Sequence, residues 1–269
     1  MIRLLLLVLG IVAAIGAARS PSLAQSLEVA DRGTTKTFTA AQLLTDKAAR
    51  SIVIADPVYK RTMTYRVIAM ADLLRDLKVG SDDYVQARAV DNFSVAIPAA
   101  LLKAGAFLAI ETAAAPWPKL PGGSNATAGP FYIVWQRRPG IDISSEYWAY
   151  HLAALTVTDS PAKRWPDLAV GVDIPATDRI HRGLDRFVAV CMACHRFAGA
   201  GEGMQGPDLA RPMNPVDYFQ PEALRKFLRD PKSVRDWPEQ KMPAFSEEML
   251  SAADIDAIVA WLAYEAPRR

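Results

Sequence analysis

The sequence contains very little cysteine. Its 269 residues include two cysteines, Cys191 and Cys194, so a disulfide within the chain can only join this pair. Such a bridge would close a very short loop, and the stabilisation that a disulfide provides grows with loop length. Cross-linking therefore explains these two thiols poorly, and another role has to account for them.

The sequence also lacks an apolar run long enough to cross a bilayer. The run from Leu4 to Ala18 has 15 residues, whereas a spanning helix needs about 20. Arg3 precedes it, and Ser22 and Ala24 provide the small residues of a signal peptidase site. We therefore expect a signal peptide over 1–24, cleavage near Ala24, export to the periplasm and no stable membrane span afterwards. Retention of the segment as an anchor is the alternative.

An excess of charge of one sign is absent as well. Without residues 1–24 the chain has 29 basic and 29 acidic side chains. This balance gives no reason to expect nucleic acid as a partner. Residues 165–269 carry 13 basic and 16 acidic side chains. That asymmetry is compatible with weak attraction to a basic surface or with scattered, solvated charges.

The two cysteines belong to the segment Cys191-Met192-Ala193-Cys194-His195, the C-x-x-C-H pattern of covalent haem attachment. Each thiol can add to one vinyl group of a porphyrin, and the histidine that follows then lies under the ring, where it can coordinate iron. A thioredoxin-like redox pair and half of a zinc site remain alternatives. Haem explains all three residues, so we predict one covalent haem c.

Helical patterns surround this motif. Asp178 can cap a helix whose apolar positions, at spacings of three and four, lead into the motif. Gly183 within this helix costs about 1 kcal/mol relative to alanine, which indicates that another backbone approaches closely there. Ser251 and Asp254 form the cap of a last helix with Trp261 beside its apolar face. From about residue 177 onward the chain resembles class I c-type cytochromes, in which two such helices cross.

This resemblance implies roles for further residues. The carbonyl of Pro207 would accept a hydrogen bond from the proximal imidazole. Met242 lies where that family places its distal methionine, so His195 and Met242 are the expected iron ligands. Arg235 and Trp237 are expected to bind the haem propionates, as is Lys241. The alternative distal ligands are Met204, Met213 and Met249, of which Met213 is the best.

Residues 27–158 have a different pattern, with short apolar or alternating runs between turn residues. Strands are predicted at 36–39, 51–55, 84–89, 94–97, 108–111, 131–136 and 152–157. Helices are predicted at 67–77 and 99–104 and, in the second half of the chain, at 221–230. The order of these elements favours an α+β domain with a mixed sheet rather than a doubly wound parallel one.

Four segments of this half, at 84–98, 108–111, 129–135 and 148–150, have an order that resembles the molybdopterin-binding domain of the sulfite oxidase superfamily. Enzymes of that family hold molybdenum through a cysteine thiolate, and this chain has no cysteine outside the haem motif. The resemblance therefore implies a sulfite oxidase-like fold kept for docking rather than for catalysis.

The sequence thus predicts a two-domain chain. An α+β domain at 25–160 is joined by a proline-bearing linker at 161–177 to an all-α cytochrome c domain at 178–269. The predicted function is electron transport between periplasmic partners, a dehydrogenase or an oxidase, without catalysis by the chain itself. A molybdenum oxidoreductase with its own haem relay and a haem-based gas sensor are the alternatives.

Overall fold

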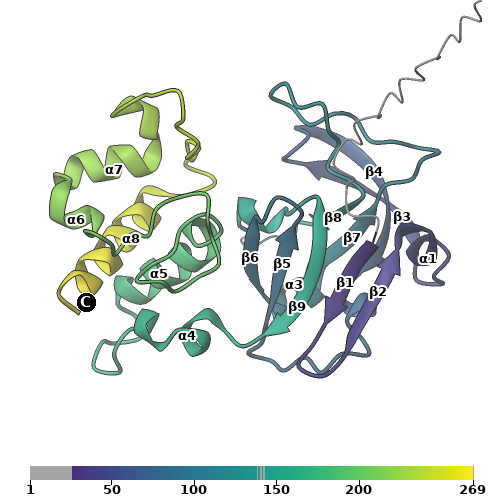
Figure 1. Cartoon of the computed structure of the whole chain (residues 1–269), viewed down its shortest axis with the longest axis horizontal. Coiled ribbons are helices and arrows are strands. Elements are labelled where there is room, and N and C mark those ends of the chain that lie inside the picture. Colours follow the sequence, from purple (N-terminus) through teal and green to yellow (C-terminus); the bar gives the residue numbers. More distant parts are fainter. Residues whose placement is uncertain (1–25, 138, 140, 142, 269) are drawn as a thin grey trace, which may run out of the picture.

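Two bodies of different secondary structure make up the chain (Figure 1). The computed structural model describes residues 26–268 except 138, 140 and 142. The predicted signal peptide lies outside these residues. No helix in the described part of the chain is both long and apolar enough to span a membrane.

The N-terminal body contains two β-sheets. The five-stranded sheet has the order β2-β1-β9-β5-β6, with β1 and β9 parallel and the other neighbours antiparallel. The four-stranded sheet has the order β3-β4-β7-β8 and is antiparallel throughout. The strands are β1 (Ser26–Ala30), β2 (Thr35–Thr39), β3 (Arg50–Asp56), β4 (Arg61–Ala69), β5 (Tyr84–Ala89), β6 (Ser94–Pro98), β7 (Ala106–Ile110), β8 (Phe131–Trp135) and β9 (Leu152–Thr158). This is the mixed-sheet domain that the sequence predicts.

Short helices connect the strands, and they are α1 (Ala40–Leu44), α2 (Met70–Leu73), α3 (Ala99–Gly105) and the 3₁₀ turn η1 (Ser145–Tyr147). The prediction for 67–77 is wrong at its start, because residues 67–69 complete strand β4. The buried residues Met63, Tyr65 and Val67 alternate with exposed ones, and this two-residue period is that of a β-strand. The spacing of the apolar residues after it suggested a longer helix than α2. Strands β1 and β4 were not predicted, whereas the other seven were.

Aromatic side chains fill the core of this domain. Tyr65 makes edge-on ring contacts with Trp117 at 4.9 Å and with Tyr132 at 6.0 Å between centroids. Asp56 is buried beside them, where it accepts a hydrogen bond from the Tyr65 hydroxyl at 2.7 Å and two from backbone N–H groups at 2.8 Å. These bonds replace the water that the carboxylate loses, which allows a charge inside the core.

The segment 161–177, predicted as an irregular linker, contains two short helices, α4 (Pro161–Arg164) and the 3₁₀ turn η2 (Pro166–Leu168). The expectation that its prolines block regular structure is wrong for two of the three, because Pro161 and Pro166 occupy first helical positions, where a missing N–H costs nothing. Pro175 lies outside these helices. Ser160 caps α4 through the N–H of Lys163. Leu168 is fully buried, so this segment packs against the body of the protein.

The C-terminal body is helical. It contains α5 (Arg179–Arg186), the π-helical turn η3 (Phe187–Cys191), α6 (Pro215–Tyr218), α7 (Pro221–Arg229), the 3₁₀ turn η4 (Pro231–Ser233), α8 (Ala252–Glu265) and the 3₁₀ turn η5 (Ala266–Arg268). Asp178 caps α5, and Ser251 and Asp254 form a capping box on α8, as predicted. Helix α7 agrees with the predicted 221–230 to within one residue.

Helices α5 and α8 pack closely at Gly183. A Cβ atom there would lie 2.1 Å from the carbonyl oxygen of Ala257 and 2.7 Å from Cβ of Trp261. The two backbones therefore approach to a distance that only glycine permits. This confirms the prediction that the last helix is the partner of Gly183.

Candidate functional site: a cavity around the C-x-x-C-H motif

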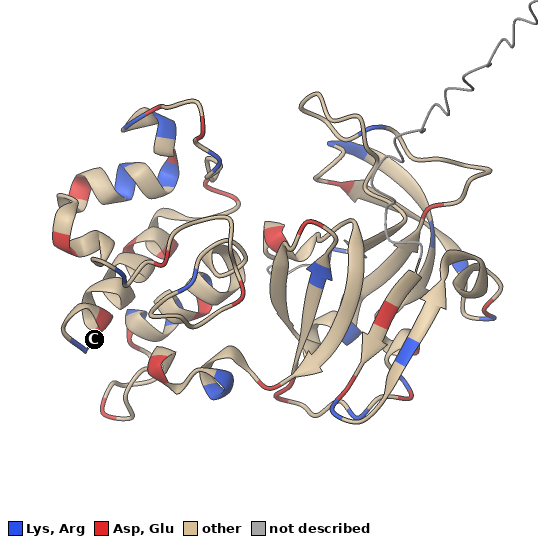
Figure 2. Cartoon of the chain, viewed as in Figure 1, with Lys and Arg blue, Asp and Glu red and all other residues tan. Residues whose placement is uncertain are grey.

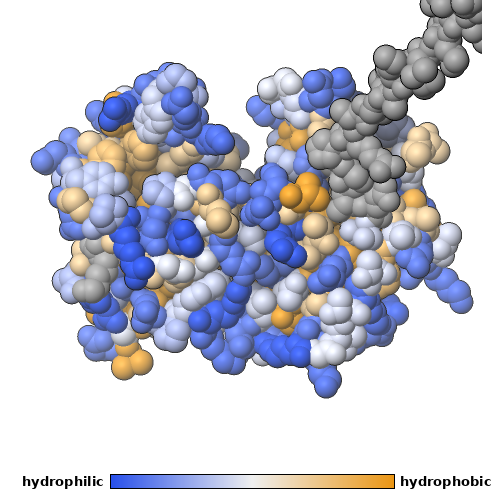
Figure 3. Space-filling model, in the orientation of Figure 1, coloured by the Kyte–Doolittle hydropathy of each residue, from blue (hydrophilic) through white to orange (hydrophobic). Residues whose placement is uncertain are grey.

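A cavity of about 700 Å³ lies in the helical domain. Figure 3 shows a hollow with apolar surface in the upper part of this domain, near α7 and the segment after it. Many of the apolar side chains of the wall come from η3, α7, α8 and the loop before α8, among them Phe187, Val190, Leu224, Phe227, Leu228, Phe245, Ile258 and Leu262. A large apolar cavity with a few polar groups is typical of a cofactor site.

The C-x-x-C-H motif lies in the cavity wall. Cys191 ends the π-helical turn η3, in which the N–H of Met192 donates to the carbonyl of Phe187 at 2.8 Å. Cys194 and His195 follow in the next turn, and both line the cavity. Single π-helical turns occur often at functional sites. Here the π-helical turn follows α5 directly and ends at Cys191.

His195 is held by the segment that follows the motif. Its Nδ1 donates a hydrogen bond to the carbonyl of Pro207 over 2.9 Å, which leaves Nε2 with a free lone pair. A Cβ atom at Gly206 would lie 2.3 Å from Cε1 of His195, so only glycine leaves room for the ring. Burial lowers the pKa of His195, which favours the neutral imidazole that a metal requires.

The two thiols are not joined to each other. Burial raises the pKa of Cys191 to about 12 and that of Cys194 to about 11, and the charge of Glu146 adds to both shifts. A thioredoxin-like pair needs a thiol whose pKa is lowered, so this environment disfavours that alternative. A structural zinc ion needs four ligands, and the described residues contain no cluster of three or more His, Cys, Asp or Glu side chains.

Met242 lies in the same cavity wall, in the loop between η4 and α8. The alternative ligands Met204, Met213 and Met249 do not line the cavity, and their side chains are 72%, 47% and 37% exposed. His181 is also absent from the wall, and its Nε2 lies 3.2 Å from the carbonyl of Ile174. Of the methionines considered for the distal side, the structure brings Met242 alone to the cavity.

The side chains predicted to bind propionates line the cavity as well. Arg235 lies over the ring of Trp237, with 5.8 Å between the guanidinium carbon and the ring centroid. Trp237 is 37% exposed, and Lys241 follows it in the same loop. All three can donate hydrogen bonds, and all three lie on the loop that carries Met242.

Gln240 is a cavity residue that sequence reasoning missed. Its Oε1 accepts a hydrogen bond from the backbone N–H of Met242 at 3.3 Å, while its Nε2 is buried without a partner. A buried donor without an acceptor is costly, and a ligand carboxylate would supply one. Its place two residues before Met242 was the only sequence signal, and a glutamine in a loop is not distinctive.

Glu146 was missed for a different reason. It belongs to η1 of the N-terminal domain, yet it lines the cavity of the helical domain. Among the described residues of the cavity wall, it alone precedes residue 178. No local sequence pattern identifies such a residue, because the contact depends on how the domains pack.

Hydrogen bonds connect the domains beside the motif. Glu202 accepts bonds from Arg164 and, at 3.1 Å, from the Ser94 hydroxyl. Gln86 closes a ring, because its amide donates to Ser94 at 2.8 Å and accepts from Arg164 at 3.1 Å. We call these four side chains the interdomain ring. The hydroxyl of Ser144 also donates to the carbonyl of Ala189 in η3 at 2.9 Å.

Among the residues that the structure describes, charged groups elsewhere do not mark a second site. Figure 2 shows acidic and basic residues spread along the ribbons of both domains. Arg164 and Glu202, which belong to the interdomain ring, form one of the ion pairs. Scattered, solvated charges are one of the two alternatives given above for the acidic excess, and this distribution agrees with that alternative.

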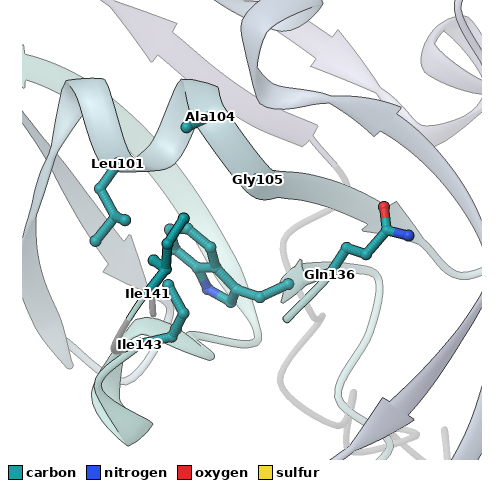
Figure 4. A pocket seen from close by; sticks show the side chains of 7 residues that line it. Leu101, Ala104, Gly105, Gln136, Ile141 and Ile143 are labelled. Carbon is teal, nitrogen blue, oxygen red and sulfur yellow. The ribbon is translucent and has the colours of Figure 1, made fainter. Parts of the chain in front are cut away.

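The N-terminal domain contains a much smaller cavity, which Figure 4 shows between α3 and the segment after β8. Its volume is about 10 Å³, room for roughly one water molecule. Its wall is formed by Leu101, Ala104, Gly105, Trp135, Gln136, Ile141 and Ile143. No titratable side chain is among these residues, so this cavity offers no chemistry.

One of three comparisons with known proteins, that with family models, matches the C-terminal region. The family model of cytochrome c oxidase, cbb3-type, subunit III matches residues 178–262. Among solved structures, the sulfane dehydrogenase SoxCD from Paracoccus pantotrophus is similar, with 13% identity and a TM-score of 0.38. That match covers 54% of this chain and 41% of the other. A search of curated proteins finds no match.

The family match and the cavity concern the same part of the chain. Residues 178–262 include α5, the C-x-x-C-H motif, the loop of Met242 and most of α8. A domain of this family implies haem c and electron transfer. The C-terminal part of this chain is a cytochrome c domain, similar to subunit III of cbb3-type oxidases, and it follows a mixed-sheet N-terminal domain.

Proposed function

We propose that the chain is an exported c-type cytochrome with one haem, which carries electrons between periplasmic redox partners. The observation that supports this most strongly is that one cavity brings together Cys191, Cys194, His195 and Met242. These are the residues needed to attach a porphyrin and to coordinate its iron from both sides. Export and the periplasm are proposed from the sequence of residues 1–24.

Each of these residues has a separate task. Cys191 and Cys194 would form thioether bonds, which use both thiols. His195 would bind iron through Nε2, while Pro207 fixes the orientation of its ring through Nδ1. Met242 would supply a thioether ligand on the other side, which favours the ferrous state and raises the reduction potential. When bound, the haem supplies a one-electron couple between ferric and ferrous iron.

The donors around the cavity fit the carboxylates of a haem. Gln240 has an unpaired, buried amide nitrogen, and Arg235 and Trp237 lie on the same loop. We assign these three side chains to the propionates, because a partly buried carboxylate requires hydrogen-bond donors. Gln240 would then link a propionate to the backbone of Met242 through its two amide atoms.

We propose that the N-terminal domain docks the redox partner, a dehydrogenase or an oxidase. Its proposed sulfite oxidase-like fold would serve this purpose without the molybdenum chemistry of that family. The sequence supports this division, since its two cysteines are both assigned to haem and neither is left to hold molybdenum.

Optical spectroscopy of protein made together with a haem-attachment system tests the proposal. We expect c-type bands in the reduced-minus-oxidised spectrum and one haem added to the mass of the mature chain. The near-infrared sulfur-to-iron band should disappear in Met242→Ala and persist in Met249→Ala, a methionine in the same half of the chain that lies outside the cavity wall. Protein without added haem mass, or a band unchanged by Met242→Ala, would contradict the proposal.

Two further measurements separate the alternatives. Rapid binding of carbon monoxide to the reduced wild-type protein would indicate a gas sensor with a displaceable methionine, whereas an electron carrier should bind it only after Met242→Ala. Metal analysis of the purified holoprotein should find iron without molybdenum. Molybdenum in a ratio of one per chain would favour an oxidoreductase instead.

A further inference from the structure

Glu146 brings a carboxyl group of the N-terminal domain into the wall of the haem cavity. The turn that carries it, η1, packs against both η3 and β6. Ser144 fixes the start of this turn, since its hydroxyl caps η1 and also donates to Ala189 in η3. The position of Glu146 is therefore set by the same contacts that join the domains.

The carboxyl group lies on the side of the cavity where the haem would be attached. Its charge acts on the thiols of both Cys191 and Cys194 and raises the pKa of each, after the larger effect of burial. In the holoprotein these thiols become uncharged thioethers. The carboxyl groups that act on this part of the cavity would then be Glu146, which acts on both attachment residues, and Asp91, which acts on Cys194.

The surroundings of Glu146 contain little that would neutralise it. The elements that contact η1 most, η3 and β6, have the sequences FVAVC and SVAIP, and Cys191 is the titratable side chain of these two described segments. Burial raises the pKa of nearby Tyr150, and the charges of Asp91 and Glu146 raise it further. Further around the cavity wall lie the charged side chains of Arg235, Glu239 and Lys241.

Burial and one hydrogen bond affect the pKa of the Glu146 carboxyl group. Burial raises the pKa of Glu146 above its ordinary value of 4.5, and a hydrogen bond from the Ser145 hydroxyl at 3.2 Å lowers it by less. No ion pair of Glu146 is found among the residues that the structure describes. A proton on this group would remove an unpaired negative charge from a poorly solvated place.

We propose that Glu146 is the proton-accepting group that the N-terminal domain contributes to the haem, so that reduction of the haem is coupled to protonation of this carboxylate. The inference rests on the proposed function. An electron delivered by a protein donor is accompanied by one proton from solvent, which adds to a carboxylate oxygen of Glu146 and gives the neutral acid. Oxidation by the acceptor releases both.

Electrostatics fixes the direction of this coupling. A negative charge near the iron stabilises the ferric state, which carries one more positive charge than the ferrous state. The pKa of Glu146 is therefore higher when the haem is reduced than when it is oxidised. The reduction potential should fall as pH rises through the window between these two pKa values, and it should be level on either side.

Spectroelectrochemical titration of the full-length holoprotein from about pH 4 to pH 9 tests this. We expect the wild-type reduction potential to fall as pH rises through the window. The potential of Glu146→Gln should stay near the low-pH value of the wild type over the whole range. At pH 8 the variant should have the higher potential. The propionates titrate in both proteins, so the difference between the two curves isolates Glu146.

Glu239→Gln is the matched control, because Glu239 also lines the cavity but is exposed on the loop of the helical domain. Its curve should follow that of the wild type. Glu146→Asp keeps a carboxyl group, so its reduction potential should still fall as pH rises. This second variant keeps the proposal testable if Glu146→Gln does not fold.

Coincident curves for wild type and Glu146→Gln would overturn the inference, as would an equal shift in Glu239→Gln. Either result, in protein with a normal c-type spectrum and sulfur-to-iron band, leaves the proposed function standing. Absence of that spectrum from the wild type would instead remove the proposed function.

Discussion

The two domains use their apolar residues in opposite ways. In the N-terminal domain, aromatic side chains such as Tyr65, Trp117 and Tyr132 pack on one another, and the cavity found there has about 10 Å³. In the helical domain, apolar side chains surround a cavity of about 700 Å³. The N-terminal core is fully packed without a ligand, whereas the helical domain has room for a large one. The stability of the second domain should therefore depend on haem, and that of the first should not.

Preventing haem attachment should have the largest effect on the difference in stability between the two domains. In Cys191→Ala with Cys194→Ala the apolar cavity wall has no covalent partner, so the helical domain should lose its whole folding free energy, on the order of 5 kcal/mol or more. The N-terminal domain should stay folded. Limited proteolysis with mass spectrometry should then yield a resistant fragment that ends within 161–177.

Wild-type holoprotein is the control, and it should resist cleavage on both sides of that segment. Equal resistance of both domains in the double variant would mean that the helical domain folds without its cofactor. Such a result would also leave the predicted boundaries at 160 and 178 without support.

The packing of α5 on α8 should be the next most sensitive feature. Gly183→Ala places a Cβ atom 2.1 Å from a backbone oxygen of Ala257, which requires the helices to separate. Overpacking of this kind costs up to about 3 kcal/mol, only partly offset by the better helix propensity of alanine. Denaturant unfolding followed at the haem absorption band should show this loss of stability in the helical domain.

Gly105→Ala in α3 is the matched control in the other domain. The nearest atom to its added Cβ is the carbonyl oxygen of Gln136 at 3.7 Å, an ordinary contact. This variant should be neutral or more stable by up to about 1 kcal/mol. Equal losses in both variants would show that Gly183 is needed for backbone conformation alone.

Gly183 also shows which features can be predicted from the sequence. Its place in an apolar helical stripe, and the Ser251 and Asp254 cap of α8, are local patterns with direct physical causes. The C-x-x-C-H motif and the loop of Met242 are local too, and the structure places them around one cavity.

Features that depend on long-range packing were missed. Strand β4 was hidden because its last residues share the apolar spacing of the helix that follows. The linker residue Leu168 is buried by the body of the protein, which no local pattern reveals. Glu146 reaches the haem cavity from another domain, and its role depends on how the two domains meet.

The end of α8 offers a pH-dependent test of the helical domain. Glu265 is 2% exposed, and burial raises its pKa to about 6. The fold therefore favours the protonated acid, so stability is full below the ordinary pKa of 4.5 and is lost as pH rises through 6. A shift of this size corresponds to about 2 kcal/mol. Glu265→Gln should remove that loss.

Urea unfolding at about pH 4 and pH 8 measures this difference. The stability of Glu265→Gln relative to wild type should increase by about 2 kcal/mol between the two conditions, and the unfolding of the N-terminal domain should be unaffected. A constant difference at both pH values would mean that Arg268, whose Nε lies 3.9 Å from Oε2 of Glu265, keeps the carboxylate charged.

A substitution in the interdomain ring should produce the smallest change in stability. It also tests directly how the two domains are linked. Glu202→Gln keeps the shape of the side chain but removes its charge, leaving Arg164 stacked on Trp165 at 4.2 Å. Because both partners are partly exposed, at 24% and 35%, the loss should be about 1 kcal/mol or less.

If the ring holds η1 against η3, the same variant should let water reach Glu146 and move the fall of the reduction potential toward lower pH. Hydrogen exchange should increase in 198–206 and in η1 while the core of each domain stays protected, whereas unchanged exchange in η1 would show that Ser144 alone fixes the position of Glu146.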